Sequence, residues 1–554
     1  MHLHRLFGCI IEVTALAKGA NLTGYEYVIV GSGAEGGPLV ARLALAGHRT
    51  KYNCTIPSYS ARASEDETMA WNFFARLNPP AGSTMKCTLY LRTGTLGGCT
   101  AHNALIAIYP HQSDFEYIAT LTGDASWSPQ NMRKYLVKME KNQYISPAAG
   151  HGYDGWLSTE TAPLNIVIED PQLLSMLTGG AFALGNETNS VIDLRTLIAG
   201  DANADTSTRD SQPAYYQIPL SANGAHRNGA REFVLAVRDA VNDDGSEKYP
   251  LDVRLNYHAT KVTFDESATP PRAIGIEFLD EQYLYKASPK FSSVIVAGGV
   301  YISPQLLKIS GIPGNFTALN GSTFDGSTND ECLKHRETSI LGDRGIYSSS
   351  GLTATMFYKS TATSNDQYDL FVLSGPVNFR GYFPNYNISA TARHDWFTWA
   401  IFKAHPRNTT GAVTLRSADP LDVPDIVYNY FDNGVSNYNA DLQALSEGLV
   451  PVIEILPGGN VTGEAVKANT KDSTWGHHAS CTCPISSDRD PMAVLDSEFR
   501  VREVSSLRVV GASVYPRIPS TFTAVSTYMI SEKAADTMLS QLNSTTASNS
   551  TILS

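Results

Sequence analysis

One short segment near the N-terminus limits the possible folds of this chain more than any other. Residues 25–30 have the sequence YEYVIV, a run of β-branched and aromatic residues that is typical of a strand. Gly31, Gly33 and Gly36 follow directly in the pattern G-x-G-x-x-G, and the next residues, PLVARLALAG, have the pattern of a helix that ends at Gly47. In such a unit the glycines allow a tight turn, close approach of a pyrophosphate, and packing of helix on strand. The segment predicts a Rossmann-like α/β unit that binds a dinucleotide.

The composition is that of a large folded protein. Of the 554 residues, 42% are hydrophobic and 17% are charged, which supplies a large core and excludes a mostly disordered chain. The net charge of −12 would repel phosphate backbones, so we expect no nucleic-acid partner. Because no run of 18 apolar residues occurs, we expect no membrane-spanning helix.

Three further blocks indicate which dinucleotide to expect. Residues 96–103 have the sequence LGGCTAHN, and a second apolar strand pattern at 293–297 precedes SPQLL and SGI within residues 303–312. With the stretch 475–536, these blocks resemble the signatures and the C-terminal region of the glucose–methanol–choline (GMC) oxidoreductases, from about residue 25 onward. The resemblance implies FAD and an α/β fold (α+β overall). Its parts would be a Rossmann-like FAD-binding domain built from discontinuous segments, and a substrate domain with an antiparallel sheet and helices.

The resemblance also implies a division of the chain into domains. The FAD-binding domain would comprise residues 24–110, 226–313 and 476–541, and the substrate-binding domain residues 111–225 and 314–475. Residues 1–23 would be a signal peptide or leader, and residues 542–554 a flexible tail.

The cofactor contacts expected from this resemblance lie in the glycine turn and in the LGGCTAHN block. Two glycines in that block would let backbone N–H groups approach the flavin closely. His102 stands where some family members attach FAD covalently, and the alternative is a histidine that packs near the ring without a bond. The expected contacts are Gly31, Gly33, Gly36, Gly97, Gly98, Thr100, His102, Asn103, Ala104, Val262, Ala512 and Thr523.

The segment WGHHASCTCPI at 475–485 contains the expected catalytic base. Against the family pattern, His478 and Thr482 fall in register, which implies that His478 takes the alcohol proton while hydride moves to the flavin N5. His477 would orient or shape the site. The spacing of the two histidines and two cysteines does not match zinc sites, so we expect no metal.

The sequence also departs from the family pattern. Gly511 stands where Asp is usual, and Phe522 stands at the second catalytic position, usually His or Asn. No acidic residue follows Glu35 until Glu65 to bind a ribose, and the segment that returns along the flavin is missing after Ile312. We predict a FAD-dependent alcohol oxidase or dehydrogenase that acts on CH–OH groups. The alternatives are a family member with impaired FAD binding or activity (a degenerate paralogue or a truncated gene model) and a non-redox lyase similar to the hydroxynitrile lyases.

The compartment is indicated by ten N-x-S/T sequons, where chance predicts roughly five. The first twenty residues contain a short apolar run and Ala15-Leu16-Ala17, a small-residue site where a signal peptidase could cut. We predict a secreted protein with N-linked glycans. The small-molecule alcohol that it oxidises and its electron acceptor, oxygen or a quinone, have no readable motif.

Overall fold

The protein is described here by a computed structural model. The described residues are 18–43, 57–66, 69–76, 87–164, 168, 170–188, 190–249, 251–255, 257–280, 283–310, 349–363, 365–391, 396–407, 411–431, 438–449, 463–476, 478–520 and 522–552. The sequence around Lys51, which lacks the expected acidic residue, and the segment that follows Ile312 lie outside them.

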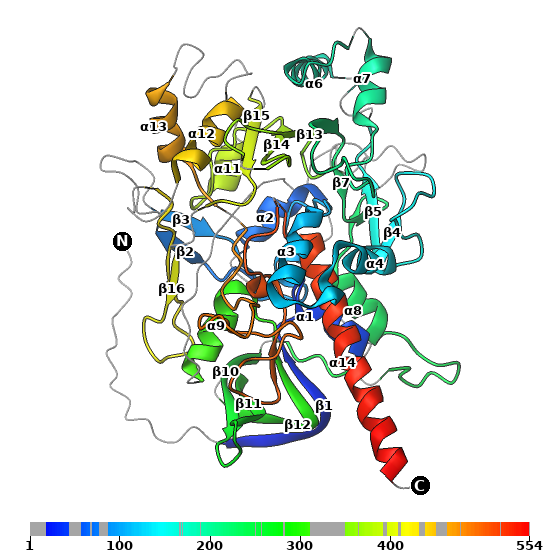
Figure 1. Cartoon of the computed structure of the whole chain (residues 1–554), viewed down its shortest axis with the longest axis vertical. Helices are drawn as coiled ribbons and strands as arrows, with labels where there is room; N and C mark the ends of the chain where they lie inside the picture. Colours follow the sequence, from blue (N-terminus) through cyan, green and yellow to red (C-terminus); the bar gives the residue numbers. More distant parts are fainter. Residues whose placement is uncertain are drawn as a thin grey trace, which may run out of the picture.

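A five-stranded sheet forms the lower half of the molecule in Figure 1. Its strand order is β1–β12–β11–β10, and β18 pairs with the end of β12. The pairs β1–β12 and β12–β18 are parallel, whereas β10, β11 and β12 form an antiparallel meander. The strands are β1 (Lys18–Val30), β10 (Tyr257–Asp265), β11 (Arg272–Asp280), β12 (Tyr283–Val296) and β18 (Leu507–Val509).

Apolar residues explain why these strands meet. Val294, Ile295 and Val296 of β12 are fully buried between β1 and β18, as expected for parallel strands covered on both faces. The two strands predicted at 25–30 and 293–297 are both confirmed, and the structure shows that they are neighbours. The fold is of the predicted class, with α1 (Gly36–Leu43) directly after the glycine turn.

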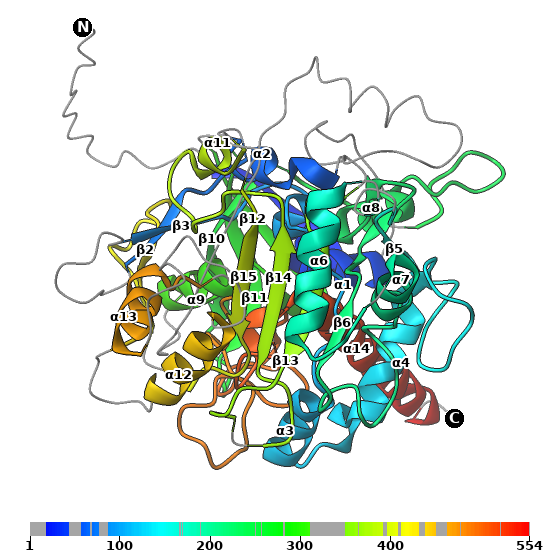
Figure 2. The same ribbon diagram turned by 90° about the horizontal axis from the view of Figure 1, so that it is seen from above.

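A second sheet, with the order β15–β14–β13–β6, is antiparallel and lies in the upper half of the molecule in Figure 1, so that its strands are near the middle of the view from above in Figure 2. Alternate residues of β13 and β14 face opposite sides, so Met356 and Val372 pack against helices α6 and α7, whereas Phe357 and Phe371 pack toward the centre of the molecule. The elements are β6 (Ala214–Tyr216), β13 (Ala354–Tyr358), β14 (Leu370–Gly375), β15 (Thr398–Lys403), α6 (Pro171–Ala183) and α7 (Val191–Ile198).

At four places the structure connects segments across the predicted domain boundaries. Residues 18–23, assigned to a leader, belong to β1, and residues 542–552, assigned to a flexible tail, continue helix α14 (Ala524–Ile552). Helix α4 (Pro129–Met139), assigned to the substrate domain, packs on α14, and its Met132, Leu136 and Met139 share the core of the five-stranded sheet. In a third sheet, β16 (Ala412–Thr414) and β17 (Asp425–Val427) join β2 (Phe73–Arg76) and β3 (Cys87–Tyr90), although the prediction put them in different domains. The packing of α4 on α14 and the third sheet join segments that are far apart in sequence, so no local sequence pattern predicts them.

The remaining elements connect these layers. Helix α8 (Ala230–Arg238) packs on α1, and α9 (Gly299–Ile309) follows β12 directly. Among the described helices, none combines the length and the apolarity needed to span a bilayer. The other elements are η2 (Pro57–Tyr59), α2 (Ser60–Ser64), η3 (Gly98–Ala101), α3 (Gln112–Thr122), η4 (Ala125–Trp127), β4 (Glu140–Asn142), β5 (Leu157–Thr161), β7 (Pro219–Leu220), β8 (Ala222–Asn223), β9 (His226–Arg227), α11 (Tyr386–Thr391), α12 (Tyr438–Leu449), α13 (Glu464–Ser473) and η6 (Ala512–Val514).

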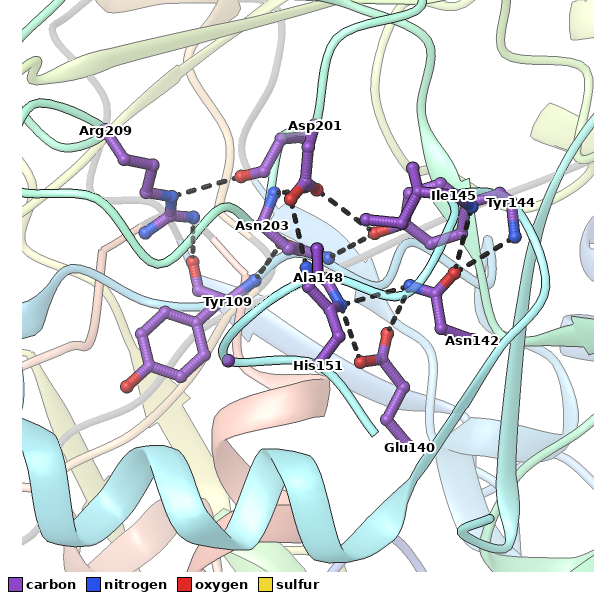
Figure 3. Close-up of polar contacts among 12 residues, drawn as sticks. Tyr109, Glu140, Asn142, Tyr144, Ile145, Ala148, His151, Asp201, Asn203 and Arg209 are labelled. Atoms are coloured by element: carbon purple, nitrogen blue, oxygen red, sulfur yellow. Dashed lines mark hydrogen bonds and ion pairs between the residues drawn. The ribbon is translucent and has the colours of Figure 1, made fainter. Parts of the chain in front are cut away.

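A buried polar network joins the end of β4 to the loop near residue 201 (Figure 3). His151 lies between two carboxylates, with Nδ1 2.8 Å from Glu140 and Nε2 3.0 Å from Asp201. Asn142 also contacts Glu140 and His151, at 3.1 Å each. Burial alone would lower the pKa of His151, but the hydrogen bonds to Asp201 and Glu140 outweigh it and raise the pKa to about 9.

This network predicts a stability that falls at alkaline pH. The pKa of His151 is about 9 in the folded chain and 6.5 in the unfolded chain. The contribution of His151 to the free energy of unfolding is therefore complete below about pH 6.5 and is lost as the pH rises through about 9. His151→Gln should cost about 3 kcal/mol at pH 6 and flatten this part of the profile, since Glu140 loses its cationic partner. Urea unfolding at several pH values measures both effects. A variant with an unchanged slope between these pH values would contradict the assignment.

Candidate active site

A cavity of about 540 Å³ opens where the three parallel strands end. The turns that follow β1, β12 and β18 contribute residues 31–35, 297–300 and Ala512 to its wall. Ligands of open α/β sheets bind outside the carboxyl ends of the strands, so this is the position expected for a dinucleotide.

The glycine turn has the geometry that the sequence predicts. Gly31 has φ of 107°, and a Cβ there would lie 2.0 Å from the carbonyl oxygen of Ala297. Gly33 lines the cavity and leaves room for a Cβ, whose nearest neighbours would be 3.8 Å away. Gly36 does not line the cavity, but a Cβ there would lie 1.9 Å from the Gly31 carbonyl oxygen, so this glycine serves the close packing of helix on turn.

The LGGCTAHN block lies directly against the glycine turn. A Cβ at Gly98, which has φ of 50°, would lie 3.0 Å from Gly33 Cα. Gly97 lies behind the cavity wall, where its missing side chain leaves room for Arg231. Gly98, Thr100, His102, Asn103 and Ala104 all line the cavity.

Arg227 holds the LGGCTAHN block in place through hydrogen bonds to Thr100 and Asn103. Its Nη1 donates to the Asn103 carbonyl oxygen and to Asn103 Oδ1, both at 2.7 Å, and to the Thr100 carbonyl oxygen at 3.2 Å. Ser60 Oγ donates to the same Asn103 carbonyl oxygen at 2.9 Å. These bonds fix the wall that carries His102.

His102 is a buried histidine in the cavity wall whose Nε2 makes no hydrogen bond within the described residues. Burial, with the nearby Arg227 and Arg92, lowers the pKa of His102 to about 3. The ring is therefore neutral at ordinary pH, and Nε2 or Nδ1 can keep a free lone pair.

A neutral histidine with an unpaired nitrogen in this wall is consistent with covalent attachment of flavin, which stays a prediction. Acid precipitation of the wild-type protein should then leave flavin fluorescence on the polypeptide, and His102→Ala should release all of it. Flavin that partitions wholly into the supernatant from the wild-type protein would contradict attachment.

The C-terminal segments complete the cavity. The N–H groups of Cys481, Cys483 and Ile485 donate to the carbonyl oxygens of residues 512–514 at 3.3, 2.8 and 2.8 Å, which places the 478–485 segment beside the turn after β18. Ala512 and Thr523 line the cavity, as expected. Val262 does not: it is fully buried in β10, and its N–H donates to Ser310 Oγ at 2.8 Å. The neighbouring residues 257–259 line the cavity instead, so the expectation for Val262 needs correction.

His478 lines the cavity and is half-buried. Its ring stacks on Phe402, with centroids 6.2 Å apart, and meets Phe522 at 5.4 Å and a steep angle. The expected second catalytic position, Phe522, is thus beside the expected base, where it offers a hydrocarbon edge instead of a hydrogen bond. His477 lies outside the described residues, so its supporting role stays a prediction.

Two family models match the chain, and both are described as GMC oxidoreductase. One matches residues 25–318 and the other residues 406–531.

The chain belongs to the GMC oxidoreductase family.

Known relatives of this GMC oxidoreductase match it along most of its length. It is 25% identical over 573 residues to an oxygen-dependent choline dehydrogenase of Photobacterium profundum, with 93% of each chain covered. It is 26% identical over 572 residues to an alcohol dehydrogenase (acceptor) of Pseudomonas putida, with 94% of this chain and 96% of that one covered. The solved formate oxidase of Aspergillus oryzae RIB40 shares the fold, with a TM-score of 0.73, 18% identity, and 94% and 99% of the two chains covered.

FAD is the cofactor of this family, and the described residues of this GMC oxidoreductase fit it. The glycine turn and the N-terminus of α1 suit a pyrophosphate, and the missing Cβ of Gly33 leaves the cavity open there. The unpaired Nε2 of His102 is a buried polar atom that needs a partner. The residues that would hold the cofactor are therefore those of the glycine turn and the 98–104 segment, with Ala512 and Thr523.

Sequence reasoning missed much of the cavity wall, including Trp71, Arg92 and Glu35. Trp71 and Arg92 lie in segments without a recognised motif, and Glu35 lies inside the glycine turn, at one of its unspecified positions. Only Glu35 could have been noticed in the sequence, because an acidic side chain is not expected in a turn that binds a negatively charged phosphate. With Asp252 it supplies the carboxylates of the described cavity wall.

In the part of the chain that the structure describes, one group of side chains is close enough to hold a metal. The possible ligand atoms of His111, Asp114 and His405 lie within 4.8 Å of one another. However, His405 Nε2 is only 2.6 Å from Asp114, whose carboxylate also accepts a hydrogen bond from Ser520 and lies 3.5 Å from Arg517. We therefore interpret this group as an ion-paired network.

The thiols of Cys481 and Cys483 are free, and burial raises the pKa of both.

Proposed function

We propose that this GMC oxidoreductase oxidises the CH–OH group of an alcohol to a carbonyl, with FAD as cofactor and His478 as general base. The observation that carries the proposal is that His478 lines the same cavity as the glycine turn and the 98–104 segment. When bound, FAD supplies the acceptor for the hydride of the carbinol carbon. The protein binds the alcohol, excludes water and removes the hydroxyl proton.

The roles of the residues at the base follow from their packing. The rings of Phe402 and Phe522 pack against the His478 imidazole and limit its rotation. Because Phe522 cannot hydrogen-bond, the proposal assigns removal of the hydroxyl proton to the imidazole of His478 without help from that position.

The substrate class that we propose is an aryl-substituted or similarly apolar alcohol. Phe379, Tyr382, Phe402, Trp475 and Phe522 line the cavity near His478, and Trp475 contacts three of them at centroid distances of 4.6 to 6.0 Å. Aromatic walls favour flat apolar groups through edge and offset contacts. A sugar would leave several hydroxyls without partners there, which costs about 1–3 kcal/mol each.

Anaerobic mixing tests this proposal. Benzyl alcohol should bleach the flavin absorbance at least about tenfold faster than glucose or choline at equal concentration, which corresponds to roughly 1.4 kcal/mol. Trp475→Ala should reduce this preference, whereas Phe182→Ala, an aromatic residue 72% exposed on α6, should not. Faster bleaching by glucose or choline would refute the substrate class.

The same experiment separates the alternatives. Protein that is purified without yellow colour would support the impaired family member. Yellow protein that no alcohol bleaches would instead support either the lyase or a family member that binds FAD but is impaired in activity. Secretion and N-linked glycosylation also stay predictions, which a loss of mass on treatment with an N-glycosidase would check.

A further inference from the structure

Glu35 is a buried carboxylic acid inside the phosphate turn, where a negative charge is not expected. It lines the cavity and is 8% exposed. Its Oε1 accepts a hydrogen bond from the N–H of Ala512 at 3.2 Å, and the backbone of Gly299 donates to the same carboxyl group. Since Glu35, Gly299 and Ala512 follow β1, β12 and β18 respectively, one carboxyl group joins the three turns that form the floor of the cavity.

The position of this carboxyl group explains the departure at Gly511. Gly511 has φ of 129°, and a Cβ built there would lie 2.2 Å from both Cγ and Cδ of Glu35. The Glu35 side chain therefore occupies the volume that any side chain at position 511 would need. The acidic group that the family pattern places at 511 is absent, and an acidic group from the first turn fills its space.

Burial is the largest influence on the pKa of the Glu35 carboxyl group, and the nearby Arg92 offsets it only in part. Burial raises its pKa to about 7, against the lowering effects of the Ala512 N–H and of Arg92. Cys483, whose thiol is buried nearby, offers no positive charge. A carboxyl group with this environment in a cavity wall is more typical of a ligand site than of a structural ion pair.

We propose that Glu35 is a cofactor-positioning residue, which holds the turns after β1, β12 and β18 in the arrangement that receives FAD and replaces an acidic side chain at position 511. Two backbone N–H groups leave lone pairs of the carboxyl group free, and a hydroxyl group is the donor that such an acceptor recognises. FAD carries hydroxyls on its ribityl chain and on its ribose, so either part can supply the partner. The proposal concerns cofactor binding and does not depend on the alcohol that is oxidised.

The test measures flavin binding in four variants. Glu35→Ala should weaken FAD retention by about ten- to hundredfold, as expected when a buried hydrogen-bond partner is removed, and Glu35→Gln should weaken it less because an acceptor oxygen remains. Gly511→Ala should cause the loss of most bound flavin when Glu35 is present, because the new Cβ would overlap the Glu35 side chain. In the double variant Glu35→Ala/Gly511→Ala the added loss should be clearly smaller, because the overlap with Glu35 is gone. The flavin-to-protein absorbance ratio and the rate of flavin loss on dialysis provide the readout.

Glu140→Gln is the matched control, because Glu140 is a fully buried carboxylate outside the cavity wall. It should lower the melting temperature and leave flavin retention unchanged. If the Glu140 and Glu35 variants lost flavin equally, the loss would be due to general destabilisation of the fold, and the proposal would be overturned. Wild-type retention in Glu35→Ala, or equal harm from Gly511→Ala in both backgrounds, would overturn it as well. ADP and riboflavin as competitors distinguish the ribose from the ribityl chain, since only the contacted part should compete less well in Glu35→Ala.

Discussion

Flavin is expected to be absent from the Gly33→Val protein while the fold survives. A Cβ at Gly33 would contact nothing closer than 3.8 Å, so the backbone tolerates a side chain. Because Gly33 lines the cavity, the two methyl groups of valine would occupy space that the cofactor needs. We expect at least about a hundredfold weaker FAD binding, which corresponds to roughly 3 kcal/mol of overpacking. The ratio of flavin to protein absorbance measures the loss of FAD, and the melting temperature of the flavin-free protein shows whether the fold survives.

Two matched variants make this result specific. Gly31→Val should unfold the chain or lower its melting temperature strongly, because a Cβ at Gly31 would overlap the Ala297 carbonyl and φ is 107°. Gly179→Val, in helix α6 where a Cβ would meet nothing within 4 Å, should keep both flavin and stability within small changes. Yellow Gly33→Val protein would show that the cofactor does not pass this turn.

Local patterns in the sequence were sufficient to predict two of the three strands whose following turns form the floor of the cavity. The strand before Gly31 and the strand that ends at Val296 follow from short β-branched runs, whereas their pairing is known only from the fold. The glycine turn could be assigned because each glycine has a separate steric reason, which a single segment of sequence already contains. His478 was placed in the cavity by a resemblance in spacing, and the cavity includes it.

Contacts between distant segments could not be predicted in this way. The bond between Glu35 and Ala512 joins residues 477 positions apart, and only the fold shows that the acid of one turn fills the empty space at Gly511. The contact expected for Val262 failed for a related reason. Along a strand only the residues near one end reach the cavity, and β10 presents Tyr257 and His258 there rather than Val262.

The domain boundaries also depended on such distant contacts. Helix α4 has an apolar face, but its sequence does not say that the partner is α14 rather than the substrate sheet. The short strands β16 and β17 lie more than 300 residues beyond β2, and a three-residue strand has too little pattern to reveal its partner.

Loss of the His478 side chain is expected to slow flavin reduction by about 10²–10⁴-fold, the usual contribution of a general base, or roughly 3–5 kcal/mol of barrier. The flavin spectrum of His478→Ala should stay nearly normal, because the residues that would hold the cofactor come from other turns. Anaerobic stopped-flow reduction with benzyl alcohol measures the rate directly. His477→Ala is the neighbouring control and should cost less.

The pH profile of the same reaction separates His478 from His102, one of the other histidines that line the described cavity. Burial, Arg227 and Arg92 lower the pKa of His102 to about 3, so His102 stays neutral between about pH 5 and pH 8 and cannot produce an ionisation there. Glu35, whose pKa burial raises to about 7, also lines the cavity, so the ionisation that belongs to the base should vanish in His478→Ala and persist in both His477→Ala and Glu35→Gln. If His477→Ala is the slow variant instead, the register of the catalytic segment is wrong by one residue. If neither variant is slow, proton removal does not depend on these histidines, and the alcohol must lose its proton to another group in the cavity.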